Sequence, residues 1–146
     1  MPRVFSDAEM RGRTTHLQQE MGRQGIDCII ASSVHTSFYY SGFWFSLPYG
    51  RFCATVIPSH GEPTLIVAKM EGHRARDFTW LGDVRTYSDE RSSLHGYVNL
   101  ISEIVNESGP EGGKIGIELD TLPHAHWTTL TQVLPQAHLV DASQIM

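Results

Sequence analysis

Hydrophobic positions along this chain recur with two different spacings, one typical of helices and one typical of strands. Intervals of three and four residues predict helices over 7–24, 71–80, 89–108 and 123–134, with a shorter helical turn at 36–41. Short apolar or alternating runs predict strands at 27–31, 52–58, 63–68, 83–87, 114–118 and 138–141. The turn at 59–62 joins the second and third of these strands into an antiparallel hairpin.

Local signals mark the ends of the first helix. Ser6 followed by Glu9 matches a capping box, and Gly25 is placed to end the helix. Because helices alternate with strands, we expect one α/β domain over residues 1–146, with helices on both faces of a central sheet that the hairpin makes mixed. The chain stops directly after the last expected strand, which we interpret as a cut at a domain boundary.

Composition excludes several classes of partner. Hydrophobic residues make up 40% of the chain and charged residues 18%, with a formal net charge of −5. Lys69 and Lys114 are the only lysines and no basic stripe is present, so nucleic acid is not an expected partner. No apolar run approaches the ~20 residues of a membrane span, and no signal peptide is visible. Cys28 and Cys53 lie in apolar runs and are interpreted as buried free thiols, so we expect a cytoplasmic protein.

Aromatic residues are concentrated in one segment. Eight of the fourteen Phe, Tyr and Trp residues lie between positions 38 and 52, where Gly and Pro predict a turning backbone. A surface loop so rich in rings indicates a contact with another subunit, another domain or a small ligand. The candidate interface residues are Phe43, Trp44 and Phe45.

Arg51 is the candidate binding residue of this segment. It stands between Gly50 and Phe52, at the start of an expected strand. An arginine held among aromatic rings is suited to binding a carboxylate through two parallel hydrogen bonds. The residues alone leave open a second interpretation, in which Arg51 stacks on Tyr49 or Trp44 at the surface and binds no ligand.

The remaining candidate groups predict no catalytic residue and no metal site in this chain. The eight histidines are scattered, and His124 and His126 are spaced so that they point to different faces of a helix. We interpret the histidines as solvated surface residues. Glu118 and Asp120 follow an expected strand, where carboxylates serve more often as capping groups than in catalysis.

Four motifs, in order along nearly the whole chain, resemble the N-terminal domain of the creatinase/prolidase superfamily, the pita-bread metallohydrolases. The first is a Gly-Ile-Asp sequence that leads into an apolar strand, and the second is a Tyr-Ser-Gly-Phe segment. The third is a hairpin with the sequence Pro-x-x-Gly-Glu-Pro, and the fourth is an Ile-Gly-Ile-Glu strand with a later Leu-Val-Asp. They lie at 25–30, 38–43, 58–67, and 115–118 with 139–141.

The resemblance implies a ribonuclease-H-like arrangement and a non-catalytic domain of a larger C–N bond hydrolase. The catalytic residues, with a divalent metal in some members, would lie in a C-terminal domain absent from this chain. The aromatic loop is most similar to that of the creatinase branch, which implies that Tyr49 and Arg51 hold the carboxylate of a small substrate across a homodimer interface. The substrate could be creatine, an ectoine derivative or an Xaa-Pro dipeptide.

Two other functions stay open on the residues. One is a stand-alone dimerisation or protein-interaction module that uses the aromatic loop. The other is an independent domain that binds small carboxylates.

Overall fold

A computed structural model describes residues 3–45, 51–88 and 93–146, and it contains the elements expected from the sequence. The helices are α1 (Asp7–Gln24), α2 (Val34–Ser41), α3 (Gly72–Phe78), α4 (Ser93–Ser108) and α5 (His124–Val133), and a 3-10 turn, η1 (Lys69–Glu71), precedes α3. The strands are β1 (Cys28–Ala31), β2 (Ala54–Pro58), β3 (Thr64–Ala68), β4 (Asp83–Tyr87), β5 (Lys114–Ile117) and β6 (His138–Asp141).

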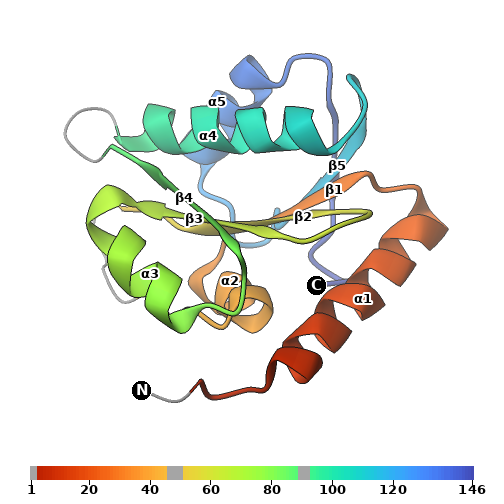
Figure 1. The fold of residues 1–146 in the computed structure, drawn as a ribbon. Helices are drawn as coiled ribbons and strands as arrows, with labels where there is room; N and C mark the ends of the chain where they lie inside the picture. The colour runs from red at the N-terminus through yellow and green to blue at the C-terminus, as the bar shows by residue number, and fades with distance from the viewer. Residues whose placement is uncertain (1–2, 46–50, 89–92) are drawn as a thin grey trace.

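The strands form one mixed sheet between two layers of helices. Their order is β4-β3-β2-β1-β5-β6, with α4 and α5 on one face and α1, α2 and α3 on the other (Figure 1). This arrangement confirms the predicted α/β fold with helices on both faces of a mixed sheet.

Strand β1 lies between β2, which runs against the other strands of the sheet, and β5, which runs in the same direction as β1. It pairs antiparallel with β2, through Ala31 and Thr55, and parallel with β5, through Ile30 and Ile117. The carboxyl ends of β1 and β5 therefore meet the beginning of β2 at one edge of the sheet. In an open α/β sheet, ligands bind outside the carboxyl ends of the strands, so this edge is where a site is expected.

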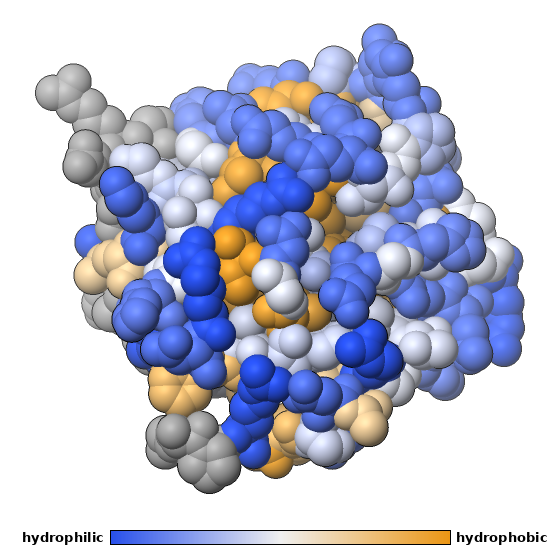
Figure 2. Space-filling view, viewed as in Figure 1, coloured by the Kyte–Doolittle hydropathy of each residue, from blue (hydrophilic) through white to orange (hydrophobic). Residues whose placement is uncertain are grey.

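The central strands are buried on both faces. Every residue of β1, β2 and β3 is buried, which explains why these strands are nearly continuous apolar runs instead of alternating ones. Cys28 and Ile30 face the layer of α4 and α5, whereas Ile29 faces α1 and α2. Figure 2 shows mostly polar helix surfaces, with apolar side chains visible in the middle of the face in view.

The first helix has the ends that its sequence predicts. The Ser6 hydroxyl accepts a hydrogen bond from the Glu9 amide at 3.2 Å, and Gly25 adopts a left-handed conformation with φ 66°. The Glu9 carboxylate pairs with Arg13, one turn along the helix, so we find half of the expected capping box.

Edge strand β4 carries a network of charges. The Arg85 guanidinium lies 3.1 Å from the Asp83 carboxylate and 2.7 Å from the Glu107 carboxylate of α4. These hydrogen bonds raise the pKa of Arg85 and lower that of Glu107. The network ties the edge of the sheet to the helix that covers it.

None of the helices in the described part of the chain is long and apolar enough to cross a membrane.

Candidate functional site

A pocket of about 270 Å³ lies at the edge where β1 and β5 end and β2 begins. Residues 32–34 after β1 and 51–53 before β2 line two of its sides. The rest of the lining comes from Phe45, Thr121, Pro123 and His126. The pocket therefore occupies the position where the topology of the sheet predicts a ligand site.

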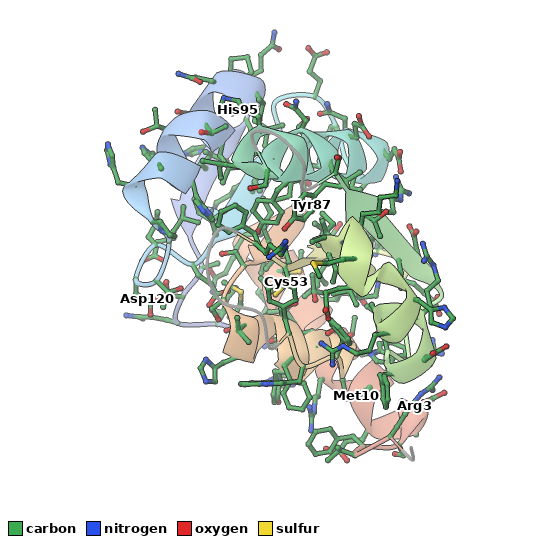
Figure 3. All side chains as sticks on the ribbon, turned by 90° about the vertical axis from the view of Figure 1, so that its left-hand side faces the viewer. Arg3, Met10, Cys53, Tyr87, His95 and Asp120 are labelled. Atoms are coloured by element: carbon green, nitrogen blue, oxygen red, sulfur yellow. The ribbon has the colours of Figure 1, made fainter. Side chains whose placement is uncertain are left out.

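The entry into β2 is fixed by two buried tyrosines. The Tyr87 hydroxyl accepts a hydrogen bond from the Phe52 amide at 2.6 Å and donates one to the Phe52 carbonyl at 2.7 Å. The Tyr97 hydroxyl donates to the Cys53 carbonyl at 3.1 Å. In Figure 3 the left-hand side of Figure 1 faces the viewer, and Tyr87 and Cys53 lie near the centre of the molecule in this view. The backbone beside Arg51 is thus held on the sheet by side chains of β4 and α4.

Arg51 is half-buried and lines the pocket together with Phe45 and Phe52. Among the described lining residues, it is the one with a permanent charge. This placement agrees with a guanidinium that binds a carboxylate, which stays a prediction. Tyr49, the second residue predicted to bind substrate, lies outside the described residues.

His126 lies in the same pocket, where sequence analysis did not place it. Only 8% of the surface of His126 is exposed. Its ring packs edge-on against the Phe52 ring, with 4.6 Å between the two ring centroids. Burial lowers the pKa of His126 below its ordinary value. The interpretation of the histidines as solvated surface residues is therefore wrong for His126, although it holds for the exposed His124. The signal that could have found it is its spacing from the apolar Leu130, one helical turn away on the buried face of α5.

Glu118 supports one wall of the pocket. Its buried carboxylate accepts hydrogen bonds from the Ser32 amide at 2.8 Å, the Ser33 amide at 3.1 Å and the Thr36 hydroxyl at 2.8 Å. These groups surround the start of α2, whose N-cap is Ser33, so Glu118 has a structural role as expected, but it fixes a segment distant in sequence and does not cap the helix that follows it. Asp120 is exposed and lies at the margin of the molecule in Figure 3.

The three interface candidates have different environments. Phe43 and Phe45 are buried in the apolar cluster beneath α3, with 2% and 4% of their surface exposed. Trp44 points outward and is 46% exposed. Its ring packs edge-on against the rings of Phe38 and His35, with 5.6 and 5.5 Å between the ring centroids. Of the three, Trp44 offers a ring to a partner, and a contact with another subunit stays a prediction.

A family model decides the relationship of this chain to known proteins. The model of the creatinase/prolidase N-terminal domain matches residues 13–146. The chain belongs to this family. The creatinase from Bacillus sp. (strain B-0618) is 29% identical over 144 residues, which are 97% of this chain and 33% of that protein. The chain thus spans about a third of the length of this curated relative.

Solved structures of the creatinase/prolidase family share the fold. A prolidase from Thermococcus sibiricus superposes with a TM-score of 0.78 at 20% identity, covering 93% of this chain and 35% of that one. The N-terminal domain of an Xaa-Pro dipeptidase from Streptococcus pyogenes gives a TM-score of 0.74 at 19% identity, covering 95% and 96% of the two chains. The predicted resemblance to this family is confirmed.

The metal of metallopeptidase members of this family lies in their C-terminal domain. Within residues 3–45, 51–88 and 93–146, no three His, Cys, Asp or Glu side chains come together as a metal site. Cys28 and Cys53 are free and buried, and burial raises the pKa of each thiol to about 12. Neither thiol is suited to act as a nucleophile.

Proposed function

We propose that this domain is the non-catalytic N-terminal part of a creatinase-like or Xaa-Pro peptidase-like C–N bond hydrolase. It completes the substrate pocket and the dimer interface, and the reaction takes place in a C-terminal domain. The family match and the length of the relatives support this proposal. We place the enzyme in the cytoplasm, where Cys28 and Cys53 remain thiols.

The position of Arg51 carries the proposal. The anchored backbone of Phe52 holds Arg51 at the pocket, which Phe45 and Phe52 also line. Creatine and Xaa-Pro dipeptides each carry a carboxylate, and a guanidinium binds this group through two parallel hydrogen bonds. We assign carboxylate binding to Arg51, together with Tyr49.

The test is Arg51→Ala in the full-length hydrolase. Loss of a charged hydrogen bond costs about 1.5–3 kcal/mol, so KM for creatine or an Ala-Pro dipeptide should rise about tenfold to a hundredfold. Arg23→Ala is the matched control, because Arg23 is exposed at the end of α1 and pairs with Glu20 at 2.8 Å. Unchanged KM and kcat in Arg51→Ala would overturn the binding role.

The dimer role is assigned to the surface around Trp44. An exposed indole next to other rings is the kind of side chain that dominates protein interfaces. Trp44→Ala should weaken self-association of the full-length hydrolase in analytical ultracentrifugation, whereas Met70→Ala, at another exposed apolar residue, should not. Equal association of the two variants would remove Trp44 from the interface. Dimers formed by residues 1–146 alone would favour an interaction module.

A further inference from the structure

We propose that the pocket at the ends of β1 and β5 is a two-point carboxylate site, in which Arg51 and His126 bind the same small ligand. The start of α5 supplies further positive potential. The inference rests on the proposed role of Arg51 and adds a second residue that determines specificity. A pocket of about 270 Å³ is at the small end of ligand sites, so it suits a small carboxylate and not a folded partner.

The His126 side chain is the observation that points to a ligand. The ring is held edge-on by Phe52 at 4.6 Å and lies 5.8 Å from the Tyr97 ring, so its direction is set by packing. Within the described part of the chain, no side chain or backbone group makes a hydrogen bond to its ring nitrogens. No enclosed side-chain nitrogen or oxygen of the described residues lacks a partner, so these nitrogens open onto the pocket. A histidine so deeply buried, with nitrogens that face a pocket, is placed to donate a hydrogen bond to a ligand.

The first turn of α5 adds to the attraction for an anion. Pro123 stands at the N-cap and gives the helix no side-chain hydrogen bond. The first amides of a helix have no partner within it, and the helix dipole makes this end positive. Because Thr121, Pro123 and His126 all line the pocket, this end of the ten-residue helix lies at the site.

The charges around the pocket favour a negative ligand. Arg51 lines it, and none of the other described lining residues is acidic. The Glu118 carboxylate, behind one wall of the pocket, is occupied by the Ser32 and Ser33 amides and the Thr36 hydroxyl. Two titratable groups lie close to His126, Cys53 in the pocket lining and Tyr97 against the His126 ring, and burial keeps both neutral by raising their pKa values.

The site is tested by His126→Phe in the full-length hydrolase. Phenylalanine keeps the ring packing and removes both nitrogens, so KM should rise about tenfold with kcat retained. In the parent enzyme KM should fall as pH drops below about 6.5 and His126 takes up a proton, since a protonated imidazole binds an anion better, and this dependence should disappear in the variant. His126→Gln should recover part of the affinity without the pH dependence. His124→Phe, on the exposed face of the same helix, is the matched control and should change neither quantity.

Direct binding is measured by NMR on the 146-residue chain, with acetate as the probe and chloride at equal ionic strength as the reference. Saturable shifts of the His126 ring and a rise in its pKa support the site, and shifts equal to those in chloride overturn it. If Arg51→Ala raises KM and His126→Phe does not, the two-point site fails and the proposed function stands. If His126→Phe raises KM and Arg51→Ala does not, the role of Arg51 fails, and the two-point site fails with it.

Discussion

The hydroxyl of Tyr87 makes two hydrogen bonds to one residue, accepting from the amide of Phe52 and donating to its carbonyl, at 2.6 and 2.7 Å. Phe52 lies just before β2, outside the regular strand pairing. A side chain of β4 therefore satisfies the backbone of Phe52 in place of a neighbouring strand. The residue next to Arg51 is thus fixed by tertiary contacts.

Replacing this hydroxyl should loosen the start of β2. Tyr87→Phe leaves the Phe52 amide and carbonyl without this partner, which should lower the free energy of unfolding by about 1–3 kcal/mol in urea denaturation. Tyr97→Phe removes a single hydrogen bond, to Cys53, and should cost less. A larger loss in Tyr97→Phe than in Tyr87→Phe would contradict this account.

The buried carboxylate of Glu118 should be a major source of stability. Glu118→Ala leaves the Ser32 and Ser33 amides without their acceptor, and we expect a loss of about 3 kcal/mol in thermal or urea unfolding. Glu118→Gln keeps an oxygen for these amides and should cost only about 1 kcal/mol. Asp120→Ala, two residues along and exposed, should change stability by less than about 0.5 kcal/mol.

The two thiols should be protected in the folded chain. Cys28 and Cys53 are buried, and their raised pKa values, about 12, leave almost no thiolate at pH 8. A thiol reagent such as DTNB should therefore label the native protein only as fast as it unfolds, and should label both thiols at once in urea. Rapid labelling of native protein at pH 8 would show that one strand opens locally.

Burial of His126 should make stability depend on pH. Its pKa is lowered in the folded state, so the unfolded chain binds more protons, and stability falls as pH drops. The loss begins near the ordinary histidine pKa of about 6.5 and continues through the lower folded pKa. His126→Phe should show a shallower decline in the free energy of unfolding between about pH 7 and pH 5. An identical slope would mean that His126 is protonated as easily in the folded chain as in the unfolded one.

Gly116 of β5 should tolerate no side chain. A Cβ at this position would lie 2.8 Å from the Cβ of Ala142 and 2.9 Å from the Cγ1 of Ile29. Gly116→Ala should therefore cost about 1–3 kcal/mol, measured by urea denaturation. Gly12 is exposed on α1, and no atom lies within 4 Å of the position that its Cβ would take. Because alanine favours the helix more than glycine does, Gly12→Ala should raise the free energy of unfolding by about 0.5–1 kcal/mol. Destabilisation of the same size in both variants would contradict the packing argument.

The elements could be predicted because their signals are local. The first helix begins at Ser6 and ends at Gly25 through bonds within a few residues, and the apolar spacing in α4 continues for the whole helix. The predicted helix over 71–80 differs in detail, since it starts with the 3-10 turn η1 and ends at Phe78.

The site could be predicted only in part, because its geometry depends on contacts between distant residues. Glu118 holds the backbone before α2, more than eighty residues earlier in the sequence, and no sequence spacing reveals that pairing. His126 is buried by Phe52 and Tyr97, which belong to other elements. In the aromatic segment, Phe43 and Phe45 turn into the core while Trp44 turns out, an alternation that only the folded sheet and α3 determine.

The charged network on β4 has a consequence for how copies of this chain can associate. A strand from a second molecule that extended the sheet beside β4 would come close to Asp83 and Arg85 and disturb their pairing with each other and with Glu107. Charged side chains on an edge strand discourage such strand addition. The molecule is therefore protected at this edge against growth into a continuous intermolecular sheet.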